Sequence, residues 1–361
     1  MHVKKKLISL LLALGLLGST QTAFAAEAAP EAEPLPAWSY GMLADGYSLG
    51  LFGDEIYTQH SQTVTTEQLD TMTKVVADKL ALLEMETRPA AEEGLVIDTT
   101  RGGVVNALYQ EAAAYDLEGI EAGAEAFLTG LGVVQGNQNG DLRLSDPCTY
   151  QEAMVMTERL ILAVYDANDA GSKGLLWKAV NGDNTLYLLG TIHLDRSNVY
   201  PLHRSIREAI EASQTVIFEL DLNDTQGMAY LQELMVYTDG TTLSNHISPE
   251  LYQRCQAAWE AVGMPAEYLD LYKPWALANA FSSMSTVDET TGSNAMAIDL
   301  YVNSKAVNAG IDIGAVETYA FQGGIFDTLS PEYQEVYLAS GLMMLLDPNT
   351  MDESTKSALT A

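Results

Sequence analysis

The spacing of apolar residues changes near residues 166–174, and this change limits what the chain can fold into more than any other feature. Before it, apolar side chains recur at helical spacing, as in segments 66–86 and 149–165. After it, short apolar runs alternate with helical segments. The sequence therefore predicts a mostly α-helical domain over residues 37–168 and a second domain of strands and helices over residues 172–361.

The second domain is expected to begin with a β-hairpin. Segments 175–180 and 185–189 are apolar and flank residues 181–184, whose Asn-Gly-Asp-Asn sequence is typical of a hairpin turn. A helix is expected over residues 203–213 and a third strand over residues 215–222. Because strands and helices alternate, we assign this domain to the α/β (α+β) class with a mixed sheet.

The helical segments also carry start signals. Thr65 and Thr66 precede the first segment as candidate N-cap residues. Thr149 begins the second segment as its N-cap, and Glu152 follows three residues later, which is the spacing of a capping box. Both helices are therefore predicted to begin at a threonine.

The N-terminus has the pattern of a secretory signal peptide. Lys4, Lys5 and Lys6 precede the apolar run 7–17, and a small-residue stretch ends at Ala25. The apolar run is shorter than the about 20 residues that cross a bilayer, which disfavours the alternative of a retained anchor. We expect residues 1–25 to be removed on export, and the Ala/Glu/Pro-rich residues 26–36 to form a linker.

The charge of the chain is strongly acidic, with 49 acidic residues against 18 Lys and Arg and a formal net charge of −31. Three lysines lie in the leader, so its removal changes this charge to −34. Such a surface repels nucleic acid and anionic polymers, which excludes nucleic-acid binding. Binding to a cell wall would therefore have to rest on shape, hydrogen bonds or bridging cations.

The chain has two cysteines, Cys148 and Cys255, one in each expected domain. An oxidising compartment would permit a disulfide between them, but the spacing does not show that they are near each other. A disulfide and two separate thiols therefore both stay open.

Part of the helical domain resembles an S-layer homology repeat. Segment 127–159 has a Gly-rich loop between two helical stretches, and residues 149–152 stand where these repeats have a Thr-Arg-Ala-Glu motif. A partial copy starts at Trp38, and a third helix start includes Arg101. The resemblance implies binding to a wall polysaccharide through Trp38, Arg101 and Glu152; the alternative is a helical spacer that has lost this binding.

A histidine follows the second expected strand directly, in the sequence Gly190-Thr191-Ile192-His193. Glycine at a strand end allows a ligand to approach the backbone closely. Imidazole is a common metal ligand and a general base near neutral pH. His193 is therefore a candidate site residue, although a hydrogen-bonded histidine at a strand end is the simpler alternative.

Two carboxylates lie in the third expected strand. Side chains alternate across a strand, so Glu219 and Asp221 would share one face, opposite Phe218 and Leu220. Two carboxylates on one face would hold a divalent cation or take part in acid/base chemistry. The alternative is a solvated strand face in a very acidic protein.

Together these features resemble the TraB/GumN family, which includes the Tiki metalloproteases. The matching segments follow the family order: 187–193 (YLLGTIH), 200–202 (YPL), 219–221 (ELD), 273–275 (KPW), 298–299 (ID) and 317–322 (ETYAFQ). The resemblance implies that His193 and Glu219 are catalytic or metal-binding residues, with Mn, Co or Zn as the divalent ion. It implies supporting roles for Gly190, Asp221, Lys273, Asp299 and Glu317, with Lys273 pairing with the carboxylates.

One departure from the family pattern bears on activity. Members have a second Gly-x-x-His near the C-terminus, and no such motif occurs before Ala361. We therefore expect either a fragment or a domain that has lost catalysis. Of the other histidines, His203 is interpreted as an exposed residue at a helix start and His246 as a surface residue.

The sequence therefore leads to a secreted, cell-wall-associated protein whose second domain descends from a metal-dependent hydrolase acting on peptides or proteins. The alternative is a non-catalytic surface binding protein in which both regions are scaffolds. A third reading, an erythromycin-esterase-like hydrolase, shares only the Gly-x-x-His idea.

Overall fold

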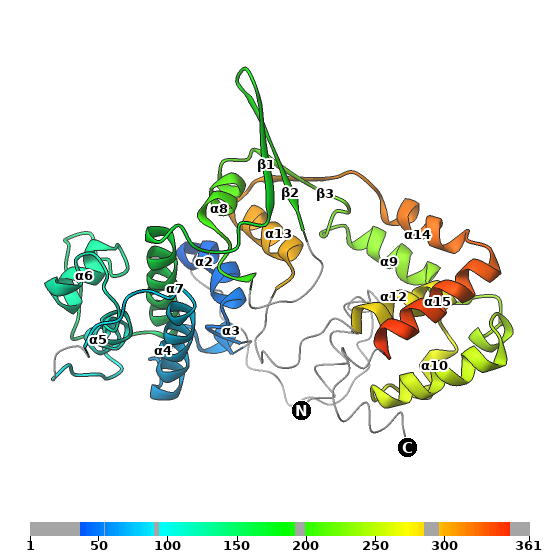
Figure 1. Ribbon diagram of the computed structural model, residues 1–361, viewed down its shortest axis with the longest axis horizontal. Helices are drawn as coiled ribbons and strands as arrows, with labels where there is room; N and C mark the ends of the chain where they lie inside the picture. Colours follow the sequence, from blue (N-terminus) through cyan, green and yellow to red (C-terminus); the bar gives the residue numbers. More distant parts are fainter. Residues whose placement is uncertain (1–36, 54, 90–93, 192–198, 285–295, 347–361) are drawn as a thin grey trace. The chain divides into compact units, whose positions relative to one another are not determined.

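The computed structural model describes residues 37–53, 55–89, 94–191, 199–284 and 296–346 (Figure 1). The expected signal peptide and linker lie outside these residues. The chain divides into two compact units. Among the described residues, unit 1 contains 217–284 and 313–346, and unit 2 contains 37–216 and 296–312. The division between the units falls at β3 and β4, inside the expected second domain. The expected domain boundary at residues 168–172 stays a prediction.

Unit 2 begins with the expected helical region. Its elements are α2 (Ala37–Ser48), α3 (Ile56–Gln59), α4 (Thr66–Ala81), α5 (Arg101–Ala112), η1 (Ile120–Ala122), α6 (Ala124–Gly130) and α7 (Tyr150–Ala167). The apolar faces of α4 and α7 pack together, and α2 also packs on α7. The periodic apolar residues of α4 are buried, as the helical spacing predicts.

Threonines start three of these helices. Thr65 and Thr149 form capping boxes with Gln68 and Glu152, in which side chain and backbone bond reciprocally. Thr100 caps α5 by accepting a hydrogen bond from Gly103 N. The predicted helix starts are confirmed. The first helix ends at Ala81, earlier than residue 86.

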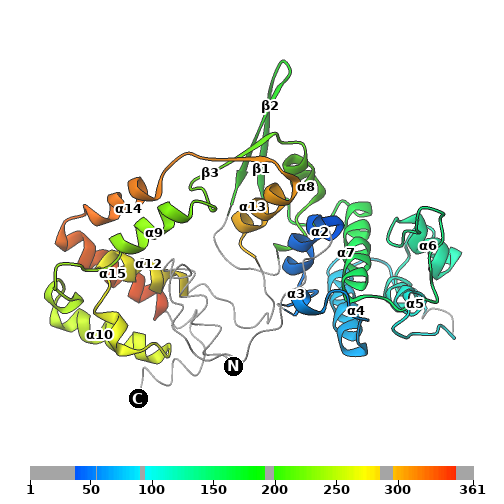
Figure 2. The same ribbon diagram turned by 180° about the vertical axis from the view of Figure 1, so that it is seen from behind.

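The rest of unit 2 contains a β-hairpin and two helices. Strands β1 (Leu175–Asn181) and β2 (Asn184–Gly190) pair antiparallel, with Leu175 opposite Gly190 and Trp177 opposite Leu188. The turn contains Gly182 at a φ of 60°, a conformation that favours glycine. Helices α8 (Arg204–Glu211) and α13 (Ile298–Ala309) pack on each other, and α13 also packs on α2 (Figure 2). The hairpin and the helix after it are confirmed.

A second two-stranded sheet joins β3 (Thr215–Phe218) to β4 (Asp312–Ala315). The strands run parallel, because Asp312 N donates to Gln214 O and Val316 N donates to Phe218 O. The α/β class is confirmed. The strands form one antiparallel and one parallel pair instead of a single mixed sheet. The third strand ends at Phe218 and not at residue 222, since β4 offers only a short partner.

Unit 1 is built mainly from helices. These are α9 (Thr225–Leu234), η3 (Leu243–Asn245), α10 (Pro249–Ala261), α11 (Ala266–Leu269), α12 (Pro274–Met284), α14 (Tyr319–Asp327) and α15 (Pro331–Leu345). Its core includes Trp259, Trp275 and Phe281. Helices α12 and α15 approach closely at Gly341, where a Cβ atom would lie 2.5 Å from Ala278 O. Among the described residues, no helix combines the length and apolarity needed to cross a bilayer.

The two cysteines are free thiols, and both are buried. Cys148 lies in unit 2 and Cys255 in unit 1. Burial raises the pKa of each thiol to about 12. Of the two alternatives left open by the sequence, the structure therefore has separate thiols.

Candidate functional site

The expected histidine, His193, lies outside the described residues. Gly190, which precedes it, is the last residue of β2 and pairs with Leu175 of β1. A Cβ atom on Gly190 would lie 3.3 Å from the Leu175 Cβ atom, so the two strands leave little room there. The role predicted for His193 stays a prediction.

Glu219 lies where β3 has ended, and two segments distant in sequence meet at this residue. Its backbone oxygen accepts a hydrogen bond from Glu317 N at 2.9 Å. Its side-chain oxygen accepts a hydrogen bond from Gln322 Nε2 on α14. The structure therefore brings together Glu219, Glu317 and Gln322. The sequence alone showed only that they belong to successive motifs along the chain.

The expected strand face with two carboxylates is wrong. Glu219 and Asp221 follow the strand instead of lying in it, so their side chains are not ordered by strand alternation. Asp221 Oδ1 accepts a hydrogen bond from Asn223 N at 2.9 Å, which closes a tight turn. Glu219 is exposed and Asp221 is half-buried.

Two further residues near this turn escaped the sequence analysis. Asp224 caps α9 by accepting a hydrogen bond from Gly227 N at 2.9 Å. Tyr319, the first residue of α14, is buried beside it; burial first, then the charges of Asp224 and Asp221, raise the pKa of its hydroxyl. A Cβ atom on Gly227 would lie 2.6 Å from the Tyr319 ring, so glycine permits this contact. The signal for Asp224 is its place before an amphipathic segment, but nothing local indicates Tyr319.

Lys273 does not pair with these carboxylates. Its Nζ atom lies 2.7 Å from Asp327 Oδ1, and Trp275 Nε1 donates to the same oxygen at 3.1 Å. Asp327 is the last residue of α14, and Lys273 directly precedes α12. The predicted pairing is therefore wrong, because the Lys-Pro-Trp segment ties the start of α12 to the end of α14.

The remaining supporting residues are split between the units. Glu219, Asp221, Lys273 and Glu317 belong to unit 1. Gly190 and Asp299, which lies in the first turn of α13, belong to unit 2. Carboxylate oxygens suit a divalent ion. Within the described ranges, however, no three His, Cys, Asp or Glu side chains are grouped as metal ligands. The described side chains alone therefore do not complete a metal centre.

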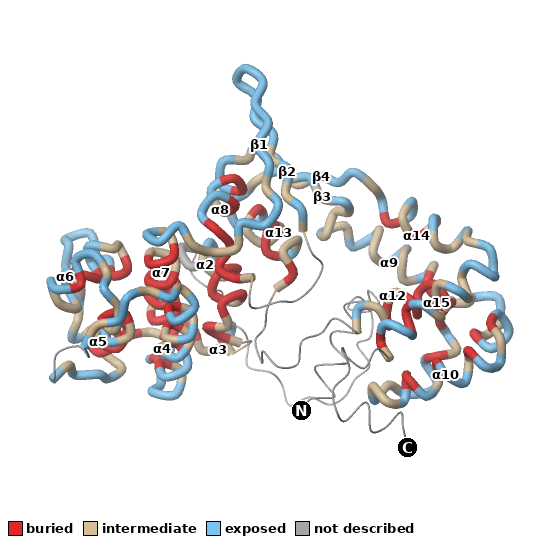
Figure 3. Tube along the Cα trace, in the orientation of Figure 1, coloured by how far each residue is buried: buried red, intermediate tan, exposed pale blue. Residues whose placement is uncertain are grey.

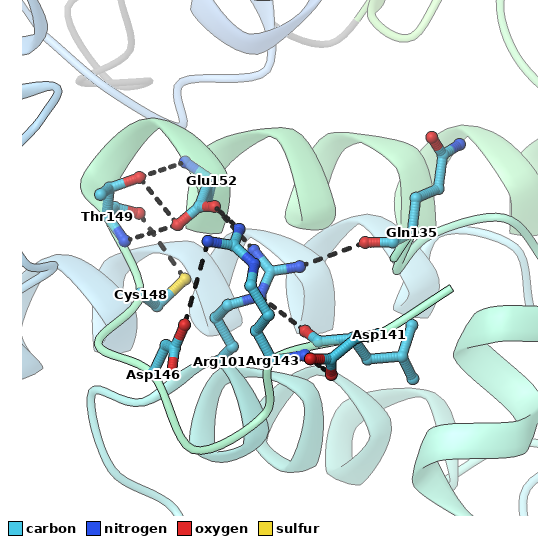
Figure 4. A network of polar contacts seen from close by, with 9 residues as sticks. Arg101, Gln135, Asp141, Arg143, Asp146, Cys148, Thr149 and Glu152 are labelled. Atoms are coloured by element: carbon cyan, nitrogen blue, oxygen red, sulfur yellow. Dashed lines mark hydrogen bonds and ion pairs between the residues drawn. The ribbon is translucent and has the colours of Figure 1, made fainter. Parts of the chain in front are cut away.

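Two of the three expected wall-binding residues, Arg101 and Glu152, take part in an internal network (Figure 4). Arg101 Nη1 lies 2.8 Å from Glu152 Oε1, and the Arg101 side chain is only 7% exposed. The same guanidinium donates to Leu142 O at 3.0 Å and to Gln135 O at 3.3 Å, and so holds the Gly-rich loop. Arg143 adds a second contact to Glu152 Oε1 at 3.1 Å.

This network gives Arg101 and Glu152 a structural role, because a guanidinium bonded on several sides is not presented to solvent. Trp38 lies in α2, but its side chain is outside the described part of the chain. Wall binding through these residues stays a prediction.

The two other histidines have structural contacts. His203 is the N-cap of α8, where its Nδ1 atom accepts a hydrogen bond from Ser205 N at 3.1 Å. Its Nε2 atom lies 3.0 Å from Asp169 Oδ1. The helix-start position is confirmed, but His203 is buried and not exposed as expected. His246 is exposed and its ring stacks on Tyr237, which confirms a surface position.

Comparisons with known proteins support the family resemblance of the second domain. The profile of the TraB/PrgY/gumN family matches residues 175–360. The chain is 26% identical over 194 residues to "Metalloprotease TIKI1" from Danio rerio. That alignment covers 47% of this chain and 38% of the relative, so the chain spans well under half of that protein. No solved structure matches the chain significantly.

Proposed function

The chain belongs to the TraB/PrgY/gumN family, and we propose that it is an exported, wall-associated protein whose family domain is a metal-dependent hydrolase of peptides. The observation that carries this proposal is the contact of Glu219 with Gln322 and Glu317. These residues come from family segments about a hundred positions apart, and their contact supports a shared site. The similarity to a protein named as a metalloprotease supports the chemistry.

The predicted site residues divide into groups that bind the metal or transfer protons and groups that position them. His193 is a metal ligand or general base, and Glu219 is a second ligand or the acid/base group. Gln322 positions the Glu219 carboxylate through its amide hydrogen bond. Asp221 and Glu317 add negative charge around the site. A divalent ion of the Mn, Co or Zn type is the cofactor, and a peptide or protein is the substrate.

Metal titration of the full chain tests this function. Calorimetry with Mn²⁺, Co²⁺ and Zn²⁺ should give one specific site in the wild type. His193→Ala and Glu219→Ala should each weaken it at least about tenfold, the smallest loss expected even for groups that only orient a ligand. Glu260→Ala, which removes an exposed carboxylate of α10, is the matched control and should bind like the wild type. Equal, weak binding by all four proteins would remove the metal-site proposal.

A non-catalytic surface binding protein is the second candidate. It is favoured by the large apolar side chains that the hairpin exposes, among them Trp177, Val180 and Leu188, because exposed apolar surface is typical of binding sites. Sedimentation of the full chain with purified cell walls tests the wall association shared by both candidates. Because the protein is strongly acidic, binding should persist at high salt, where charge attraction is screened. If the chain stays in the supernatant at low salt as well as at high salt, it does not bind the wall.

A further inference from the structure

A buried carboxyl group lies in the centre of unit 2 and has no role in the proposed site. Glu158 of α7 is 0% exposed. Neither of its carboxyl oxygens has a hydrogen-bond partner among the described residues, and the same holds for the buried Ser48 Oγ of α2. A buried carboxylate without a partner is costly, whereas a protonated carboxyl group is far less so. Glu158 therefore needs an explanation that apolar packing does not supply.

The elements around Glu158 join the helical region to the family domain. Asp45 of α2 accepts a hydrogen bond from the Tyr301 hydroxyl of α13 at 2.6 Å. Lys305 of α13 lies 2.8 Å from the other Asp45 oxygen and donates to Gly41 O at 3.0 Å. Asp45 and Tyr301 are themselves buried. These contacts hold α13, whose first turn carries Asp299, against α2.

Helix α2 in turn lies close to the Glu158 side chain. A Cβ atom on Gly46 would come within 2.9 Å of Met154 Sδ and 3.4 Å of Glu158 Oε2, so glycine allows the two helices to approach. Anything that enlarges the Glu158 carboxyl or draws water to it would therefore act first on α2. Asp45, which directly precedes Gly46 in α2, contacts Tyr301 and Lys305 of α13, so the same disturbance would reach α13.

The charges facing Glu158 come from several elements. Burial is the largest cause that raises its pKa well above the usual range, and the charge of Asp45 on α2 acts in the same direction. Lys305 of α13, Arg207 of α8 and Arg159 of its own helix oppose this rise. Helix α4, also packed on α7, buries only apolar side chains. Burial first, then the charges of Asp45 and Glu158, raise the pKa of the Tyr301 hydroxyl on α13.

We propose that Glu158 is a proton-dependent latch: while its carboxyl group is protonated, α2 and α13 stay docked on α7, and loss of the proton loosens them. The ionised carboxylate would face the Asp45 carboxylate in a buried site. Repulsion would separate α2 from α7 and pull on the contacts of Asp45 with Tyr301 and Lys305. The helical region thereby controls how α13, a helix of the family domain, packs on α2.

The direction of the pH effect follows from the raised pKa of Glu158. Below the pKa of the unfolded chain, both states are protonated and Glu158 costs nothing. As the pH rises beyond that value, the unfolded state ionises first and the folded state loses stability. The loss is about tenfold in the folding equilibrium for each pH unit, until the pKa of the folded state is reached. The latch is therefore closed in acid and loosens as the pH rises.

Denaturant unfolding of the full chain between pH 4.5 and pH 8.5 tests the latch, with Glu158→Gln as the variant. Glutamine keeps the shape and cannot ionise. The folding equilibrium of E158Q, relative to the wild type, should become more favourable as the pH rises through this window, by up to about tenfold for each pH unit. Hydrogen exchange of α13 and α2 should slow in E158Q at the alkaline end. Glu118→Gln, at an exposed glutamate of unit 2, is the matched control and should follow the wild type.

Two results would overturn the proposal. One is a pH profile of E158Q that runs parallel to that of the wild type. The other is read on the wild type and is independent of how the variant folds. Infrared spectra at about pH 6, where carboxyl groups of ordinary pKa are ionised, should contain the band of a protonated carboxylic acid, and this band should be lost as the pH rises to 8.5. If the band is missing at about pH 6, or persists unchanged to pH 8.5, Glu158 does not exchange its proton across this window in the folded chain and no latch exists.

Discussion

The helical region of unit 2 and the β-hairpin that follows it differ in how far they bury the same residue types. Leu160 of α7 is 0% exposed, whereas Leu188 of β2 is 54% exposed. In the same way, Val76 of α4 is fully buried and Val180 of β1 is 62% exposed. Figure 3 shows buried stretches along α4 and α7 and an exposed tip on the hairpin. The helices cover each other, while the hairpin pairs only with itself among the described strands. An apolar pattern therefore predicts local conformation better than it predicts burial.

The largest difference between the two regions should appear on truncating matched leucines. Leu160→Ala leaves a cavity in the core and should lower the free energy of unfolding by about 2–5 kcal/mol. Leu188→Ala removes a mostly exposed side chain and should change it by less than about 1 kcal/mol. Chemical denaturation of both variants measures the two values. Equal losses would mean that the hairpin face is covered in solution.

A smaller effect is expected at the ion pair that holds the Gly-rich loop. Arg101→Ala should cost about 2–3 kcal/mol, somewhat below the full cost of breaking a buried pair, because Glu152 keeps Arg143 and Thr149 as partners. Thermal unfolding measures the loss. Arg88→Ala, at a partly exposed ion pair with Glu121, is the control and should cost less than about 1 kcal/mol. If Arg101→Ala left the free energy of unfolding unchanged, Arg101 would have no structural role, and the predicted role in wall binding would be favoured.

The smallest of these effects concerns the helix caps. Thr149→Ala should lower the free energy of unfolding by about 1 kcal/mol, since the N-cap of α7 loses its acceptor for Glu152 N. Thr149→Ser, which keeps the hydroxyl, should restore most of this stability. Calorimetry compares the pair. If serine is no better than alanine, the cap does not stabilise α7.

The candidate site shows why part of the structure escaped prediction. The motif order placed Glu219 and Glu317 in one site region, and the structure brings them together. The end of β3 at Phe218 was missed, because apolar alternation continues to residue 222 and only the short β4 limits the pairing. Lys273 was given the wrong partner, since Asp327 is 54 residues away and carries no local mark.

Short-range interactions made the helix starts and the hairpin turn readable from the residues alone. Thr65, Thr149 and Gly182 act on neighbours within three residues, so their effect is written in the local pattern. Burial and long-range pairing depend on which surfaces meet after folding. Tyr301 bonds to Asp45 across 256 positions, and no local rule selects that pair. Packing free energy, summed over many contacts, makes that choice.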